Sequence, residues 1–150
     1  MKRLQHSDYM KLALEEAKKA MDLGEIPVGC IIVKDDVIIS TGYNTRETCN
    51  DSTGHAEINA IKSACKKLKN WRLAGCTLYV TLEPCPMGMG AIMNSRIDMV
   101  VFGAYDIKSG CCGSAFDMNS LSLNHKTEIL GGICELQCHN MLNDFFSSVR

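Results

Sequence analysis

The sequence predicts an α/β fold: a three-layer α/β/α sandwich built on a mixed five-stranded sheet. Two observations carry this prediction. The apolar run Val28–Val33 has no polar interruption, as expected for a strand buried on both faces. Farther along, a helical segment separates the apolar strands Cys76–Thr81 and Met99–Gly103. A helix between two strands makes them parallel neighbours with a right-handed crossover, so helices must cover the sheet.

The N-terminal segment is expected to form a packing helix from about Ser7 to Leu23. Ser7 is the expected N-cap, and Gly24 ends the helix. Apolar residues recur at helical spacing and are expected to face the core: Met10, Leu14, Ala17 and Met21.

A β-hairpin and a second helix follow. Lys34–Asp36 turns the chain after the first strand, and Val37–Thr41 returns as its partner. The polar segment Cys49–Gly54 is expected to be a loop, and the second helix begins at about His55. Its buried stripe is expected to consist of Ile58, Ile61, Cys65 and Leu68.

The second half of the chain adds two more helices and the last strand. A helix from about Cys85 to Asn94, opened by prolines, joins the two parallel strands. The long loop Ala104–His125 is typical of a functional or disordered segment. A short fifth strand within Lys126–Leu130 precedes a last helix over about Cys134–Val149. That helix is expected to bury Cys138, Met141, Leu142, Phe145 and Val149.

The composition is that of an ordinary globular protein, and residues 1–150 are expected to form a single domain. Hydrophobic residues make up 46% and charged residues 22%. No apolar run is long enough to span a membrane, and no signal-peptide pattern opens the chain. We therefore expect a cytoplasmic protein whose nine cysteines are mostly reduced. Because the net charge is only −1, a nucleic-acid partner would have to bind a local patch.

His55, Glu57 and Cys85 carry the candidate chemistry. His55-Ala56-Glu57 and Pro84-Cys85 match most of the His-x-Glu and Pro-Cys-x-x-Cys signature of zinc nucleobase deaminases. An imidazole and a thiolate are zinc ligands, and a predicted helix start favours the thiolate of Cys85. Glu57 would stand beside the metal and move protons. Each motif alone is weak, because His55 could be a hydrogen-bonded histidine and Cys85 a small buried apolar residue.

Gly88 departs from this signature, which expects the second cysteine at that position. A catalytic zinc normally has three protein ligands, so we expect weaker zinc binding and reduced turnover. Cys111 and Cys112 are the nearest candidates in sequence for a substitute thiolate, although a surface or core role is expected for both. Met87 and Met89 offer soft sulfur atoms that suit Zn²⁺ poorly.

Segments along nearly the whole chain are similar to those of one protein family. They are Glu25–Gly29, Gly42–Asn44, His55–Ile58, Thr77–Cys85, Gly90–Ile97, Val101–Ala104, Lys108–Gly110, Gly113-Ser114, Asn124-His125 and Phe145-Phe146. In these segments the chain resembles the bacterial tRNA-specific adenosine deaminases. The resemblance implies a cytidine deaminase-like fold, a zinc cofactor and a homodimer. It also implies conversion of the wobble adenosine in a tRNA anticodon stem-loop to inosine.

The resemblance further implies roles for individual residues. Zinc-bound hydroxide would attack adenine C6, with Glu57 as proton shuttle and ammonia as leaving group. Asn44 would hydrogen-bond the flipped nucleoside. The anticodon groove would be lined by Asp106, Lys108, Asn124 and His125. The last helix would meet RNA through Phe145, Phe146 and Arg150. Structural roles remain open: Asn44 as a turn cap, Phe145 in the core, and Asn124-His125 as residues that shape a loop.

Two other functions compete with this interpretation. The first is a small-molecule deaminase of guanine, cytosine or a nucleoside, which uses the same chemistry. The long loop and the aromatic C-terminal helix disfavour it, because a free base needs no extended groove. The second is a non-catalytic RNA-binding relative whose metal site is degraded at Gly88. Retention of Glu57 disfavours this second function, because a pure binder does not need that carboxylate.

Overall fold

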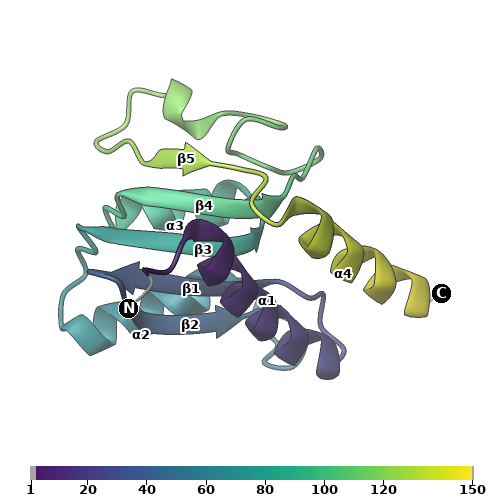
Figure 1. Ribbon diagram of the computed structural model, residues 1–150. Helices are drawn as coiled ribbons and strands as arrows, with labels where there is room; N and C mark the ends of the chain where they lie inside the picture. Colours follow the sequence, from purple (N-terminus) through teal and green to yellow (C-terminus); the bar gives the residue numbers. More distant parts are fainter. Residues whose placement is uncertain (1–2, 150) are drawn as a thin grey trace.

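The computed structural model describes residues 3–149 as three layers, with a five-stranded sheet between two pairs of helices (Figure 1). The strands are β1 (Gly29–Lys34), β2 (Val37–Tyr43), β3 (Cys76–Leu82), β4 (Met99–Ala104) and β5 (Glu128–Leu130). Their order in the sheet is β2-β1-β3-β4-β5. β1 is antiparallel to β2 and β3, whereas β3, β4 and β5 are parallel. The predicted mixed sheet with a parallel half is therefore confirmed.

Two helices cover each face of the sheet. They are α1 (His6–Asp22) and α4 (Glu135–Ser148) on one face, and α2 (Ala56–Leu68) and α3 (Pro86–Asn94) on the other (Figure 1). Successive side chains of β1 belong to different cores: Ile31 packs on the α1 and α4 side, and Ile32 on the α2 and α3 side. The strand is thus buried on both faces, as its apolar run predicts. Within the described part of the chain, every helix is too short or too polar to traverse a lipid bilayer.

The ends of two helices differ from the prediction. Gln5, and not Ser7, is the N-cap of α1, because the backbone N–H of Gln5 donates to the carboxylate of Asp8 at 2.8 Å. Ser7 lies inside the first turn. Val149 was predicted to be buried but is 64% exposed, since it follows the last helical residue and lies beyond the sheet.

The buried faces of α1 and α2 are built largely from small residues. Of the stripe predicted in α2, only Ile61 is buried, and Ile58, Cys65 and Leu68 are half-buried. Those that are buried in α2 are Ala56, Glu57, Ala60, Ile61 and Ala64. In α1, likewise, Leu14 and Met21 are only half-buried, and three of the six buried residues of the helix are alanines. Small side chains let a helix backbone lie close to a strand, and the larger apolar residues then flank the contact.

Gly42 in β2 is where α2 approaches the sheet most tightly. A Cβ atom at this position would lie 2.5 Å from the carbonyl oxygen of Ala56 and 2.7 Å from the backbone nitrogen of Ala60. Both neighbours are backbone atoms, so the contact can be relieved only by moving the helix. Because α2 begins directly after His55, Gly42 also fixes the position of the candidate site.

Replacing Gly42 with alanine is expected to lower the free energy of unfolding by about 1–3 kcal/mol, as overpacking of a close-packed interior does. Urea unfolding followed by circular dichroism measures this change. Gly90→Ala is the matched control. Its Cβ would meet only the terminal methyl of Met118, at 3.8 Å, so it is expected to stabilise the protein by up to about 1 kcal/mol. Equal stability of Gly42→Ala and Gly90→Ala would contradict the close contact between Gly42 and the backbone of α2.

Candidate active site

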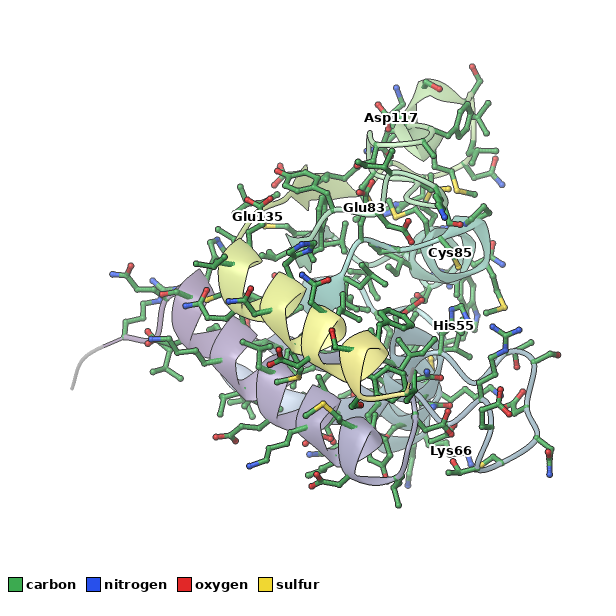
Figure 2. All side chains as sticks on the ribbon, turned by 90° about the vertical axis from the view of Figure 1, so that its right-hand side faces the viewer. His55, Lys66, Glu83, Cys85, Asp117 and Glu135 are labelled. Carbon is green, nitrogen blue, oxygen red and sulfur yellow. The ribbon has the colours of Figure 1, made fainter. Side chains whose placement is uncertain are left out.

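The candidate catalytic residues converge where helices α2 and α3 begin. His55 is the N-cap of α2, Glu57 lies in the first turn of that helix, and Cys85 is the N-cap of α3. The prediction that His55 and Cys85 stand at helix starts is therefore confirmed. One ligand atom from each of the three side chains lies within 4.8 Å of the others. Figure 2 shows His55 and Cys85 on the same side of the molecule as Glu83.

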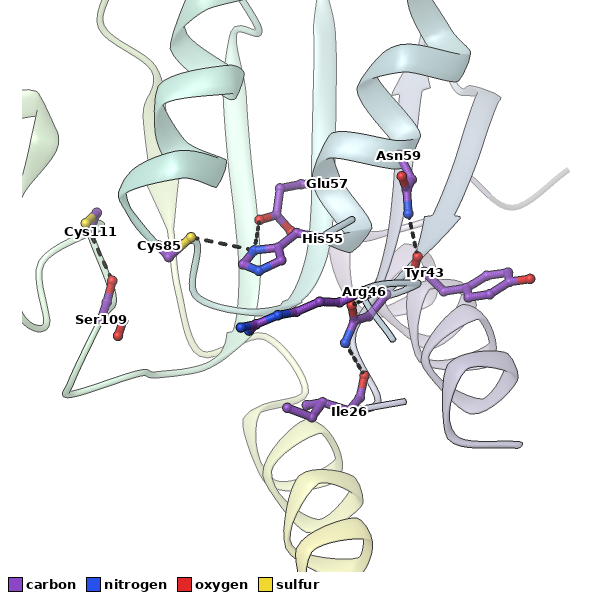
Figure 3. A network of polar contacts seen from close by, with 10 residues as sticks. Ile26, Tyr43, Arg46, His55, Glu57, Asn59, Cys85, Ser109 and Cys111 are labelled. Carbon is purple, nitrogen blue, oxygen red and sulfur yellow. Dashed lines mark hydrogen bonds and ion pairs between the residues drawn. The ribbon is translucent and has the colours of Figure 1, made fainter. Parts of the chain in front are cut away.

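His55 is at the centre of this cluster (Figure 3). Its Nδ1 atom is 3.6 Å from the sulfur of Cys85 and 3.6 Å from Oε1 of Glu57. His55 and Cys85 are half-buried, whereas Glu57 is only 3% exposed. An imidazole nitrogen, a sulfur and a carboxylate oxygen form a donor set that fits zinc. The side chains turn toward one another and not apart, which a shared metal requires.

The pKa values of two donors reflect their pairing. The hydrogen bond with Cys85, and then that with Glu57, raises the pKa of His55 to about 10. Burial alone would raise the pKa of Cys85, but the hydrogen bonds from His55 and from the backbone of Gly88 outweigh burial and lower it. In the metal-free pair, the contact thus favours the imidazolium form of His55 and shifts Cys85 toward the thiolate. The thiolate is the form of cysteine that binds metals.

Gly88 lies one turn into α3 and faces Glu57. A Cβ atom built on Gly88 would lie 2.1 Å from Oε1 and 2.9 Å from Cδ of Glu57. The carboxylate thus fills the space that a side chain at position 88 would use. The thiol of Cys111 instead donates to the carbonyl of Ser109 at 3.5 Å, and Cys111 belongs to the core under α2 and α3. Cys112 contacts the sulfur of Met89, so neither cysteine replaces the missing ligand.

The three donors line a cavity of about 360 Å³, a size typical of small-ligand sites. Its lining consists of Ile26, Val28, Asn44, Arg46, His55, Ala56, Glu57, Leu82, Glu83, Cys85, Asp106 and Ser109. Apolar residues form part of the wall, and the donors lie together at one side. Such a cavity has room for one heterocyclic base against the three donors.

Two of the predicted substrate contacts, Asn44 and Asp106, line the same cavity. Both also hold the backbone of their loops. The amide of Asn44 donates to the carbonyl of Ile26 at 3.2 Å, and its oxygen accepts from the N–H of Arg46 at 3.1 Å. Oδ1 of Asp106 accepts two backbone N–H groups, from Lys108 and from the next residue, at 3.1 Å each. Asn44 therefore caps a turn at the cavity edge.

The other predicted substrate contacts do not line this cavity. Lys108 is exposed on the loop. Asn124 and His125 border a separate depression beside Asn94, at the far end of α3, where a ring nitrogen of His125 is 2.8 Å from the carbonyl of Ile97. Phe145 is 8% exposed and packs edge-on against the exposed Phe146. Arg150 lies outside the described residues.

Glu83 is a site residue whose role the sequence prediction missed. It is 2% exposed and accepts the backbone N–H groups of Asp106, Cys112 and Ser114 at 3.0, 3.0 and 3.2 Å. The loop can wrap this closely because Gly110 has no Cβ, which would lie 2.3 Å from Cδ of Glu83. Glu83 thereby holds the loop that forms one wall of the cavity. A carboxylate directly after a buried strand was the signal available in the sequence.

Glu25 performs the same task on the opposite wall. Its buried carboxylate accepts the N–H groups of Glu47 and Thr48, at 3.1 and 2.6 Å, and the hydroxyl of Thr48 at 2.8 Å. Burial would raise the pKa of Glu25, but the hydrogen bonds from Thr48 and Glu47 outweigh it and lower the pKa. The turn that carries Arg46, whose side chain extends beside His55 in Figure 3, is anchored in this way.

Fold and site together define the class of the protein as a nucleobase deaminase: a mixed sheet presents His-x-Glu and Pro-Cys at two adjacent helix starts. The chain matches the MafB19-like deaminase family over residues 4–150. It is 48% identical over 143 residues to the tRNA-specific adenosine deaminase of Bacillus subtilis, covering 95% of this chain and 89% of that protein. The chain belongs to the family of tRNA-specific adenosine deaminases.

Solved structures agree with this assignment. One, from studies of A-to-I editing by tRNA:A34 deaminases at the wobble position of transfer RNA, superposes with a TM-score of 0.87 at 38% identity. The match covers 90% of this chain and 99% of that chain. A guanine deaminase from Bacillus subtilis is 42% identical, with a TM-score of 0.65 over 68% of this chain and 66% of that chain. The predicted fold and family are thus confirmed.

Glu83→Gln is expected to release the loop that follows β4. One amide oxygen cannot replace two carboxylate oxygens, and a buried charge-assisted network is broken, so stability should fall by about 1–3 kcal/mol. Hydrogen exchange should accelerate at the backbone N–H groups of Asp106, Cys112 and Ser114. Glu15→Gln, on the exposed face of α1, is the matched control and should change neither quantity. Unchanged exchange in the loop would show that Glu83 does not hold it.

In the metal-free protein, Cys85 is expected to react with iodoacetamide as a partly ionised thiol. Its alkylation rate should rise less between pH 6.5 and pH 9 than that of the exposed Cys49, because the lowered pKa of Cys85 leaves more thiolate at the lower pH. Site-resolved mass spectrometry measures both rates in one sample. Added zinc should protect Cys85 and leave Cys49 reactive. Equal pH dependence of the alkylation rates of the two cysteines would contradict the lowered pKa of Cys85.

Proposed function

We propose that this protein hydrolytically deaminates the wobble adenosine of a tRNA anticodon to inosine, with zinc held by His55 and Cys85. The observation that carries the proposal is the convergence of His55, Glu57 and Cys85 on one small cavity. Membership of the tRNA-specific adenosine deaminases supports the choice of substrate. The proposal treats residues 1–150 as one deaminase domain that acts in the cytoplasm as a homodimer.

The proposed reaction consumes water and releases ammonia. Zinc in such a site supplies the activation of water for attack on adenine C6. Glu57 takes a proton from the water and delivers it to the ring nitrogen and the leaving amine. Its burial beside the cavity favours this transfer, because little bulk water competes for the proton. The donors line the wall of a cavity and cannot reach an atom inside a base stack, so the adenosine must be flipped out of the loop.

The proposed RNA contacts surround this cavity and extend from it. Asn44 and Asp106 would contact the flipped nucleoside, since both already line the cavity. Lys108, Asn124, His125 and Phe145 are proposed to contact the anticodon arm more distantly. We add Arg46, an exposed cation at the cavity edge, as a partner for a backbone phosphate. Because the net charge of the chain is −1, such local cations must supply the attraction for RNA.

A free-base deaminase is the second candidate function. The similarity to a guanine deaminase favours it, and the cavity has room for a free purine. The match to that structure covers 66% of its chain, whereas the match to the tRNA:A34 deaminase covers 99%. The more complete match supports tRNA as the substrate. A third possibility, an RNA-binding relative without activity, would follow if Gly88 abolished the chemistry altogether.

Deamination assays on an anticodon stem-loop with adenosine at the wobble position test the proposed function. Inosine should form in the stem-loop, while free adenosine, cytidine and guanine remain unchanged under the same conditions. Restoring a thiolate with Gly88→Cys should raise the rate by more than the roughly 10- to 100-fold that an outer-shell partner of a metal contributes. Gly88→Cys/Glu57→Gln should be inactive, because its proton shuttle is absent.

Two results would decide against the proposed function, and a third would contradict only the impairment by Gly88. Faster turnover of a free base than of the stem-loop would establish the small-molecule function. Tight stem-loop binding without inosine, unchanged in Gly88→Cys, would establish a non-catalytic binder. Equal zinc occupancy and equal turnover of the parent chain and Gly88→Cys would show that Gly88 does not impair the enzyme.

A further inference from the structure

We propose that Glu57 is the third protein ligand of the metal in this chain, in the place that a side chain at position 88 would take. The inference rests on the metal assignment in the proposed function, that zinc binds between His55 and Cys85. It changes the role of Glu57 in the resting protein from a free acid beside the metal to a donor on it. Gly88 then supplies no ligand atom and leaves room for the carboxylate of Glu57.

The first support is the position of the carboxylate. A Cβ atom at Gly88 would lie 2.1 Å from Oε1, 2.9 Å from Cδ and 3.1 Å from Cγ of Glu57. No side chain at position 88 is compatible with Glu57 in this conformation. Because residue 88 is glycine, the carboxylate can occupy the space one turn into α3, where it faces the two other donors.

The second support is the geometry of the three donors. Oε1 of Glu57 is 3.6 Å from Nδ1 of His55, and Nδ1 is also 3.6 Å from the sulfur of Cys85. Ligands that bind at roughly 2.0–2.3 Å from zinc lie about 3–4 Å apart around a tetrahedral ion. The three atoms therefore need only small movements to surround one ion. The fourth position of such an ion would face the cavity that these donors line.

The third support is that the remaining candidates are engaged elsewhere. Among residues 3–149, no further His, Cys, Asp or Glu belongs to this donor group. Cys111 bonds to Ser109, and Glu83 is surrounded by backbone donors of its loop. Glu57, in contrast, forms an ion pair only with the half-exposed His55 among residues 3–149.

This assignment has a consequence for the chemistry. A carboxylate oxygen that is bound to the metal is not available to accept a proton from water. Glu57 would have to leave the metal in every catalytic cycle, which adds a second cause of slow turnover to the loss of a thiolate. A cysteine at position 88 would displace the carboxylate and supply a sulfur ligand, so it would restore both functions.

Zinc affinity, measured by competition with a chromogenic chelator, tests the assignment without any deamination assay. Glu57→Gln in the parent chain should weaken zinc binding by about 100-fold or more, beyond the 10- to 100-fold effect typical of an outer-shell partner. In the Gly88→Cys background, Glu57→Gln should lower zinc affinity by less than about tenfold. This difference is the coupling between positions 57 and 88.

Gly88→Ala provides an independent variant that keeps Glu57. Its methyl group pushes the carboxylate away from the donors and offers no ligand, so zinc affinity should fall nearly as far as in Glu57→Gln. The double variant Gly88→Ala/Glu57→Gln should bind zinc about as tightly as Glu57→Gln alone, because both substitutions remove the same ligand. Gly90→Ala, in the same helix, is the matched control. Its Cβ would meet only Met118, at 3.8 Å, and its affinity should equal that of the parent.

The outcomes separate this inference from the proposed function. An unchanged zinc affinity in Glu57→Gln or Gly88→Ala, or an equal loss in the two backgrounds, overturns the third-ligand role and leaves the zinc site of His55 and Cys85 intact. No zinc binding by the parent chain overturns both proposals. Circular dichroism of the metal-free proteins verifies that each variant is folded before its affinity is compared.

Discussion

The meeting of two helix starts at one end of the sheet is the constraint on which the site depends. α2 and α3 lie on the same face of the sheet, and each carries a metal-type donor on its N-cap residue. A cap residue is positioned by backbone geometry and not by the rotamer of a long side chain. Both ends also present unpaired N–H groups and a partial positive charge, which favour the thiolate of Cys85. The sheet therefore sets the donor distances before any metal binds.

Two buried carboxylates form the frame around these donors. Glu83 holds the loop after β4, and Glu25 holds the turn before α2. Each is satisfied mainly by backbone N–H groups, which makes the loops part of the rigid core. Uncompensated burial would be costly for either carboxylate, so the hydrogen bonds and the loop conformation stabilise each other. The cavity walls thus have a defined shape although no strand or helix supplies Asn44 or Asp106.

Much of this arrangement follows from local patterns in the sequence. The apolar run of β1 and the helix between β3 and β4 define the mixed sheet, and the two motifs define the donors. The alanine-rich faces of α1 and α2 were not predictable from the spacing of large apolar residues, because they depend on close approach to a strand. The hydrogen bonds of Glu83 join residues more than twenty positions apart, and nothing local encodes them. Asn124 and His125 belong to the same predicted loop as Asp106 but border a different depression. A long loop lacks the periodicity of a helix or strand, so the sequence cannot predict where its side chains lie.

Gly88 shows how far the fold and the chemistry of this protein are separable. The backbone at position 88 is helical and the core around it is formed by Met89, Ile92 and Met93, so the absence of a side chain leaves the packing of α3 intact. His55 and Cys85 keep their separation because their helices are fixed by the sheet. In the proposed metal site only the third coordination position would be affected, and the carboxylate of Glu57 lies in the space beside Gly88. A frame that positions donors through backbone caps can therefore accept a different third donor without refolding. If Glu57 is that donor, as proposed, it cannot act as ligand and as base at the same time.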